Sequence, residues 1–126
     1  MKILFAAGGT AGHINPALAV ASYIRENYPE TQILFIGTAD HMESRLVPNA
    51  GFDFETIEIS GFRRSLTPSA IMHNVKTVVQ LIKSESKSKK IIKDFNPDVC
   101  VGFGGYVSGP VLEKAAALGI PTCIHE

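Results

Sequence analysis

The sequence contains little that would mark a disulfide-stabilised or metal-binding protein. It has two cysteines and no tryptophan in 126 residues. Two thiols in apolar runs do not make a disulfide scaffold, and we expect Cys100 and Cys123 to be reduced residues of buried strands. No spacing of histidine, cysteine and carboxylate residues is typical of a metal site, so we expect neither a metal nor a cofactor.

The chain also has no long apolar run. The apolar stretch near the N-terminus is short and leads directly into glycines, which is unlike a signal peptide. No stretch approaches the roughly 20 apolar residues that span a bilayer. These absences predict a soluble protein with at most peripheral membrane contact, and the length suits a single compact domain.

The net charge is zero, but the charges are unevenly distributed. Residues 63–93 hold eight basic residues against Glu85 alone, a net charge of +7, and the rest of the chain carries −7. The basic residues are Arg63, Arg64, Lys76, Lys83, Lys87, Lys89, Lys90 and Lys93. This asymmetry predicts an anionic surface or ligand on one side of the molecule. We expect no nucleic acid partner.

Short apolar runs alternate with longer helical patterns. Strands are predicted at 2–7, 32–36, 53–59, 98–102 and 121–124, and helices at 15–27, 41–50, 67–95 and 108–118. This alternation favours a parallel sheet covered on both faces. With right-handed crossovers it predicts an α/β, Rossmann-like doubly wound fold with strand order 3-2-1-4-5. Because the chain stops at the tip of a strand, we expect it to be the first domain of a longer polypeptide.

Two glycine-rich loops follow predicted strands and lead into helices. The first is Gly8-Gly9-Thr10-Ala11-Gly12-His13, and the second covers residues 102–110. Backbone N–H groups at such turns, together with helix N-termini, bind phosphates and other polar ligands. Because the first and fourth strands are neighbours in the predicted order, both loops flank the switch point where ligands bind. The sequence therefore predicts one ligand site between the two loops.

These motifs resemble the N-terminal domain of the MurG family of peptidoglycan N-acetylglucosaminyltransferases. The resemblance covers essentially the whole chain and rests, in order, on residues 8–19, 37–43, 59–63, 104–110, 119–121 and 125–126. It implies the N-terminal half of an inverting GT-B glycosyltransferase, without the C-terminal domain that holds most of the UDP-N-acetylglucosamine. Such enzymes transfer N-acetylglucosamine to the muramyl 4-hydroxyl of lipid I, giving lipid II at the cytoplasmic face of the bacterial plasma membrane.

The acceptor in that reaction carries a diphosphate, and both loops offer donors suited to it. We expect His13 to be the base for the attacking hydroxyl; alternatively, it orients the acceptor or contacts the donor phosphates. The expected substrate-binding residues are Gly9, Thr10, Ala11, Gly12, His13, Asn15, Gly104, Gly105, Tyr106, Ser108, His125 and Glu126. His41 and His73 have no partner pattern and are predicted to be surface histidines.

The long helical stretch after Pro68 carries apolar residues at helical spacing, interleaved with lysines. The pattern fits an ordinary core helix with a solvated cationic face. It also fits a patch that rests on anionic lipid, where each cation contributes roughly 1 kcal/mol. We favour the membrane patch because the implied substrate is a lipid. Its residues are Ile71, Met72, Val75, Val79, Lys83, Lys87, Lys89 and Lys90.

Other interpretations stay open at this point. The chain could be a non-catalytic membrane-recruiting subunit of a two-chain glycosyltransferase, or part of another GT-B enzyme with a lipid acceptor, such as a diacylglycerol galactosyltransferase. A dinucleotide-binding dehydrogenase is disfavoured because the first loop lacks Gly-x-Gly-x-x-Gly and the second strand ends in Gly37-Thr38 rather than an acid. Since it lacks a donor site, the 126-residue chain alone is expected to be inactive as a transferase.

Overall fold

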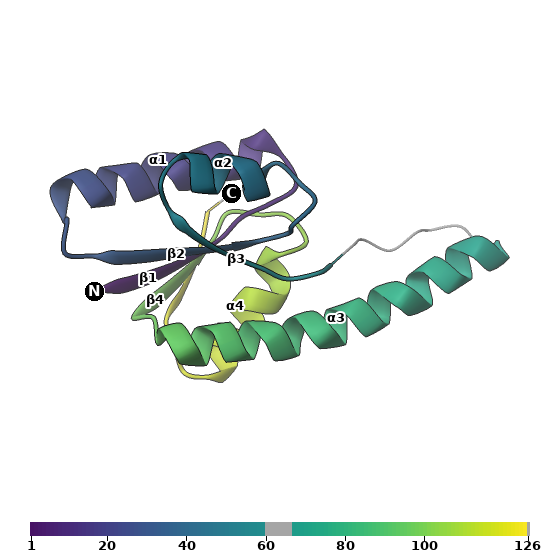
Figure 1. Cartoon of the computed structure of the whole chain (residues 1–126). Coiled ribbons are helices and arrows are strands. Elements are labelled where there is room, and N and C mark those ends of the chain that lie inside the picture. Colours follow the sequence, from purple (N-terminus) through teal and green to yellow (C-terminus); the bar gives the residue numbers. More distant parts are fainter. Residues whose placement is uncertain (60–66, 126) are drawn as a thin grey trace.

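The computed structural model describes residues 1–59 and 67–125 as a five-stranded parallel sheet with helices on both faces (Figure 1). The strands are β1 (Lys2–Ala6), β2 (Gln32–Gly37), β3 (Asp53–Thr56), β4 (Val99–Gly102) and β5 (Thr122–Ile124). The helices are α1 (Ala11–Asn27), α2 (Glu43–Asn49), α3 (Pro68–Phe95) and α4 (Ser108–Ala117). The order β3-β2-β1-β4-β5 confirms the predicted Rossmann-like doubly wound topology.

The sheet separates two apolar layers. Under α1 and α2, Phe5 stacks on Phe35 and on Phe103, with ring centroids 5.0 and 5.7 Å apart. On the other face, Leu4 and Ile36 belong to the layer that packs against α4 and the end of α3. Successive side chains of a strand point to opposite faces, so β1, with both faces covered, is apolar from Ile3 to Ala6. This buried strand fixes the position of the loop that follows it.

Helix α1 begins at Ala11, four residues earlier than the sequence predicted. The glycine turn winds directly into the helix, because the N–H groups of His13 and Ile14 both donate to the carbonyl of Thr10. Ala11, Gly12 and His13 therefore belong to the first turn of a helix. The first glycine loop, residues 8–13, therefore combines a short turn with the start of α1.

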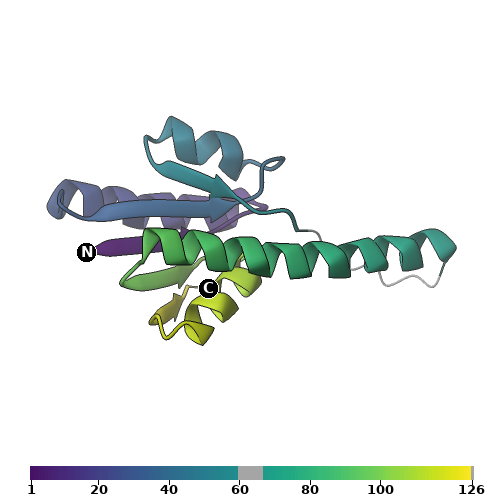
Figure 2. The ribbon, with the colours of Figure 1, turned by 60° about the horizontal axis from the view of Figure 1, so that its bottom comes forward.

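Helix α3 is longer than the sheet that supports it. Its 28 residues span about 42 Å at 1.5 Å per residue. The C-terminal part is held by buried Ile91 and Ile92, and Figures 1 and 2 show the N-terminal part extending past the sheet. Thr67 caps the start by accepting from the N–H of Ala70, and Asn96, in the left-handed region at φ 53°, ends the helix.

The two cysteines differ in their surroundings. Cys100 is fully buried in β4, and burial raises the pKa of its thiol to about 12, so it is a protonated core residue as expected. The same expectation is wrong for Cys123, which is exposed. It lies in β5, an edge strand of three exposed residues, where an apolar run in the sequence does not produce burial.

Candidate functional site

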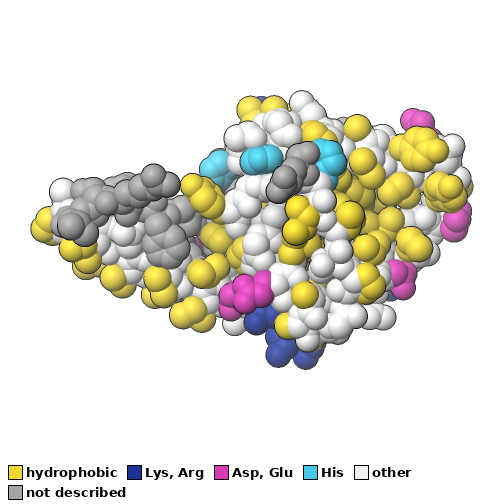
Figure 3. Space-filling view, turned by 180° about the vertical axis from the view of Figure 1, so that it is seen from behind, with side chains coloured by type: hydrophobic (Ala, Val, Ile, Leu, Met, Phe, Trp, Pro, Cys, Tyr) yellow, Lys and Arg dark blue, Asp and Glu magenta, His cyan; other side chains and the backbone are white. Residues whose placement is uncertain are grey.

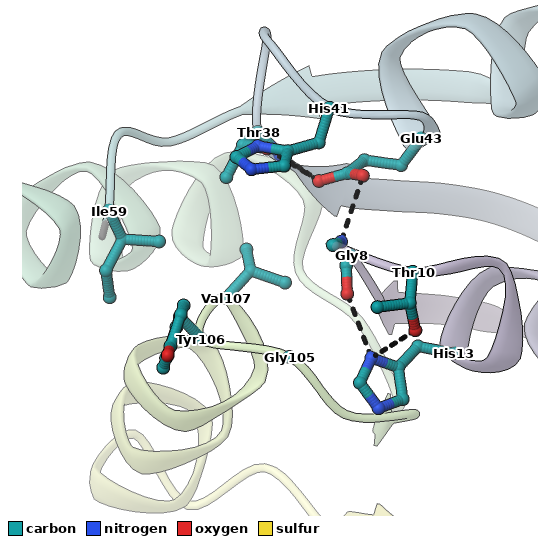
Figure 4. Close-up of a pocket in the computed structure, with 11 residues that line it drawn as sticks. Gly8, Thr10, His13, Thr38, His41, Glu43, Ile59, Gly105, Tyr106 and Val107 are labelled. Atoms are coloured by element: carbon teal, nitrogen blue, oxygen red, sulfur yellow. Dashed lines mark hydrogen bonds between the residues drawn. The ribbon is translucent and has the colours of Figure 1, made fainter. Parts of the chain in front are cut away.

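A pocket of about 590 Å³ lies where β1, β2 and β4 end, between the two glycine loops (Figure 4). The first loop supplies one wall with Gly8, Gly9, Thr10 and the ring of His13, and the second supplies Gly105, Tyr106 and Val107. The turn after β2 closes the pocket with Thr38, His41 and Glu43. The predicted site at the carboxyl edge of the sheet is thus present as a cavity in the structure.

His13 is oriented by the loop that carries it. Its Nδ1 lies 3.0 Å from the carbonyl oxygen of Gly8 and 3.3 Å from Oγ1 of Thr10. A carbonyl oxygen only accepts, so Nδ1 carries the proton and donates it to Gly8. In the neutral ring, Nε2 is then left with a free lone pair. The imidazole is held in the tautomer that a proton acceptor needs.

The second loop fits closely against the first. Gly104 and Gly105 have φ values of 107° and 85°, a region that favours glycine. A Cβ on Gly104 would lie 2.6 Å from the His13 ring, and a Cβ on Gly105 would overlap the carbonyl oxygen of Gly8. Glycine is required at both positions by conformation and by space. The backbone of one loop therefore forms the support for the other.

Glu43 is a fully buried carboxylate at the bottom of the pocket. Its Oε1 accepts from the N–H and the hydroxyl of Thr38 at 2.9 and 2.7 Å, and its Oε2 accepts from the N–H of Gly9 at 3.1 Å. Burial raises the pKa of this carboxyl, but the hydrogen bonds outweigh burial and lower the pKa below its ordinary value. Glu43 is therefore ionised at neutral pH and only accepts hydrogen bonds.

Several predicted contact residues do not line this pocket. Ala11, Gly12 and Asn15 lie on α1, and Gly104 packs beneath His13. Ser108 is buried, and its hydroxyl accepts from the N–H of Gly104 at 3.1 Å and lies 3.0 Å from the carbonyl of Ala6. Because these bonds occupy the hydroxyl, Ser108 holds the loop in place rather than facing a ligand.

His125 does not line this pocket. Its ring packs on Phe103 with centroids 5.1 Å apart, and its backbone N–H donates to the carbonyl of Gly102. Glu126, Arg63 and Arg64 lie outside the described residues. As ligand contacts, the residues named from the sequence stay predictions.

Two pocket residues were missed by sequence reasoning. His41 is exposed, as expected of a surface histidine, but it has a partner, since its Nδ1 lies 2.7 Å from Oγ1 of Thr38, and the residue lines the pocket. Glu43 received no role, because a glutamate at the start of a helix is usually exposed. The available signal was spacing: Gly37-Thr38 ends a strand and Glu43 follows five residues after Thr38. His73 is half-buried on α3, away from the pocket.

The doubly wound sheet and the pocket at its carboxyl edge define a Rossmann-like α/β domain. Residues 3–126 match the family described as glycosyltransferase family 28 N-terminal domain. The chain belongs to this family, as its resemblance to a peptidoglycan glycosyltransferase domain predicted.

Similar proteins agree with this assignment. A UDP-N-acetylglucosamine--N-acetylmuramyl-(pentapeptide) pyrophosphoryl-undecaprenol N-acetylglucosamine transferase of Lactococcus lactis subsp. cremoris is 52% identical over 126 residues, which cover 100% of this chain and 34% of that protein. A protein of the same name from Bacillus cytotoxicus is 51% identical, with the same coverage. The crystal structure of Acinetobacter baumannii MurG matches with a TM-score of 0.78 at 31% identity, covering 99% of this chain and 34% of that one. The chain thus spans about a third of the length of these relatives.

Proposed function

We propose that this chain is the acceptor-binding domain of an inverting glycosyltransferase, which transfers N-acetylglucosamine from UDP-N-acetylglucosamine to the muramyl 4-hydroxyl of lipid I. The observation that carries the proposal is His13, held between two glycine loops with Nε2 free to take a proton. The names of the relatives support the donor and acceptor classes. Because the chain spans 34% of those relatives, the activity of the whole enzyme is part of the proposal.

In the proposed reaction, Nε2 of His13 removes the proton of the acceptor hydroxyl as its oxygen attacks the anomeric carbon of the donor sugar. The bond between that carbon and the UDP oxygen breaks, and UDP leaves with the electron pair. The positive charge that develops on the imidazole is delocalised toward Nδ1–H, which already donates to Gly8. The protein thus stabilises the charged ring without moving any group.

The diphosphate of the acceptor needs N–H donors that are not already engaged. Gly9 does not supply one, because its N–H donates to Glu43. The first N–H groups of α1, at Ala11 and Gly12, have no acceptor within the helix and lie at its positive end. We therefore place the diphosphate over the N-terminus of α1, away from the carboxylate of Glu43.

We also propose that α3 rests on an anionic membrane. Six large apolar side chains in its projecting part are 44–60% exposed: Ile71, Met72, Val75, Val78, Val79 and Ile82 (Figure 3, left). At 100° per residue, the same stripe continues into Lys89, Lys90 and Lys93, with Lys83 at its border. Lys87 lies outside the stripe, and its Nζ is 3.5 Å from Oγ1 of Thr56 at the end of β3. Among the described helices, none is long and apolar enough to cross a bilayer. Because the acceptor of the proposed reaction is linked to a lipid, we propose a peripheral location at the cytoplasmic face of the bacterial plasma membrane.

A chimera tests the catalytic proposal. This chain is joined to the part of the Lactococcus lactis relative that it does not cover, and UDP release and product mass are measured with a lipid I analogue of shortened prenyl chain. We expect transfer to that acceptor with inversion at the sugar, and no turnover by the 126-residue chain alone. Transfer to diacylglycerol instead would refute the assigned acceptor.

Titration of the 126-residue chain with the same analogue makes the test independent of chimera folding. The backbone NMR signals of Ala11, Gly12 and Tyr106 should shift on addition of the analogue. Unchanged signals throughout the pocket would contradict acceptor binding by this domain.

Vesicle flotation tests the membrane proposal. Binding to phosphatidylglycerol vesicles should weaken as salt shortens the Debye length from about 10 Å at 0.1 M to about 3 Å at 1 M. Replacing Lys89, Lys90 and Lys93 together with glutamine should weaken binding by about a hundredfold. Arg45→Gln, which removes an exposed cation from α2, is the control. Binding that is insensitive to both salt and the lysines would contradict the proposal.

A further inference from the structure

Three polar side chains form a continuous hydrogen-bonded series on the wall opposite His13. Glu43 accepts from the hydroxyl of Thr38 at 2.7 Å, and Oγ1 of Thr38 lies 2.7 Å from Nδ1 of His41. Glu43 and Thr38 are buried, whereas His41 is partly exposed and lines the pocket. Figure 4 shows the series running from the carboxylate outward to the imidazole.

The protons in this series can be assigned from its inner end. The ionised carboxylate only accepts, so the single hydroxyl proton of Thr38 is directed to Glu43. Oγ1 of Thr38 can then only accept from His41, which places the proton of the neutral ring on Nδ1. Oδ1 of Asp40, at 3.1 Å from the same nitrogen, favours the same tautomer. Nε2 of His41 is left as an acceptor, with no protein partner among the described residues.

Glu43 also fixes the first loop. Its Oε2 accepts from the N–H of Gly9, and a Cβ on Gly8 would lie 2.5 Å from its Oε1. The carbonyl of Gly8 in turn accepts from Nδ1 of His13. A single carboxylate therefore holds the backbone that orients His13 and, through Thr38, the ring of His41.

We propose that Glu43 is a positioning residue for both imidazoles, and that Nε2 of His41 binds a hydrogen-bond donor of the acceptor sugar, either its amide N–H or a hydroxyl. The proposal rests on the proposed function and adds a second contact on the opposite wall of the same pocket. Nε2 of the neutral His41 ring can accept a hydrogen bond from an N–H or O–H group, but it can form none with an anion. An amide or a hydroxyl of the sugar therefore suits this nitrogen. In this proposal His41 takes part in acceptor binding, and the proton transfer remains with His13.

The tautomer of His41 is the first test and requires no activity. Long-range ¹H–¹⁵N spectra of the histidine-labelled chain at slightly alkaline pH show which ring nitrogen carries the proton, with His41→Ala identifying the signal. We expect Nδ1–H at His41, and a larger share of Nε2–H in Thr38→Val, which removes the hydroxyl. Thr38→Ser should restore the wild-type spectrum. A predominantly Nε2–H ring in the unchanged protein would overturn the proposal.

Kinetics of the chimera form the second test. His41→Ala and Thr38→Val should raise KM for the lipid I analogue about three- to tenfold, with KM for UDP-N-acetylglucosamine and kcat changed less than about twofold. Glu43→Gln should also lower kcat, because its amide N–H₂ replaces Oε2 or Oε1 and leaves the N–H of Gly9 or of Thr38 without an acceptor. Glu26→Gln, an exposed change of the same chemistry on α1, is the control. An unchanged KM for the acceptor in His41→Ala would overturn the proposal, even if Glu43→Gln fails to fold.

An acceptor analogue separates the two donors. When the 2-acetamido group of the sugar is replaced by 2-acetoxy, the amide N–H is lost. If the amide is the partner, His41→Ala no longer raises KM for this analogue; if a hydroxyl is the partner, the effect remains. An inactive chimera with the expected tautomer would contradict the proposed function alone, and an active chimera with the other tautomer would contradict this inference alone.

Discussion

The two glycine loops follow neighbouring strands and lead into helices, but they are held in place by different interactions. The first, at residues 8–13, is fixed by side chains: Glu43 binds the N–H of Gly9, and His13 folds back onto the carbonyl of Gly8. The second, at residues 102–110, is fixed by backbone conformation at Gly104 and Gly105 and by one buried hydroxyl. A similar glycine-rich pattern thus produces a loop with reactive groups and a loop that provides shape.

Because of this difference, the first loop carries the groups proposed for the chemistry, and the second loop supports the first. His13, the proposed base, is on the loop whose geometry depends on titratable and hydrogen-bonding side chains. The loop that supports it depends on glycines, which cannot titrate and which allow the backbone to approach closely. Changes in the first loop should therefore affect turnover and pH response, whereas changes in the second should affect stability.

The largest effect is expected at the first loop. His13→Ala removes the proposed base, and kcat of the chimera should fall by about 10²- to 10⁴-fold, the usual contribution of a positioned base. Steady-state kinetics at saturating acceptor measure it, with thermal unfolding to establish that the fold is retained. A fall of less than about tenfold would exclude the role of His13 as general base.

At the second loop the largest effect is on folding. Gly105→Ala places a Cβ against the carbonyl of Gly8 and strains a residue at φ 85°, so the free energy of unfolding should fall by about 2–4 kcal/mol. Gly119→Ala is the matched control, because its φ is 78° but nothing lies within 4 Å of the added Cβ. Denaturant titration of both variants isolates the contribution of the contact between the loops. Equal losses would mean that this contact contributes nothing.

A smaller loss is expected at Ser108. Ser108→Ala leaves the N–H of Gly104 without its acceptor in a half-buried position, which should lower the free energy of unfolding by about 1–3 kcal/mol. Ser108→Thr keeps the hydroxyl and is the comparison variant. If Ser108→Ala instead abolished acceptor binding with stability unchanged, the direct ligand contact expected from the sequence would be correct.

The smallest effect is the pH dependence of the first loop. The pKa of Glu43 is lowered in the folded chain from its ordinary value of 4.5, so the ionised carboxylate stabilises the fold above pH 4.5. That stabilisation is lost as the pH falls through the lower, folded-state pKa. Chemical unfolding of the wild type and Glu43→Gln from pH 7 downward should show a shallower acid loss in the variant. Parallel curves would contradict the ionised state of Glu43.

The fold and the location of the site were predictable because they depend on local patterns. Short apolar runs that alternate with helical patterns, together with the right-handed crossover rule, led to the correct strand order. The position of the pocket was predictable from the two glycine loops, which are also local patterns in the sequence. Burial was harder to predict where it depends on an element's place in the sheet. Cys123 lies in an apolar run, but its strand forms the exposed edge.

The polar network could not be obtained from the sequence by such rules. Glutamate is seldom fully buried, and its burial at residue 43 depends on three donors that the fold brings together from Gly9 and Thr38. His41 gains its partner only because the turn after β2 folds back over Thr38. The sequence pattern predicts the start of α1 four residues too late, because glycine disfavours helix, whereas here Gly12 lies in the first helical turn.

The contact between Gly105 and the carbonyl of Gly8 also has an entropic consequence. The two loops support each other through contacts of the protein itself, so the walls of the pocket are preorganised. When a loop becomes ordered on binding, the conformational entropy that it loses reduces the binding free energy. In this pocket most of the entropy loss on binding is that of the ligand. Affinity for the acceptor should then be set by how rigid the acceptor itself is. A conformationally locked sugar should bind more tightly than its flexible counterpart with identical polar groups.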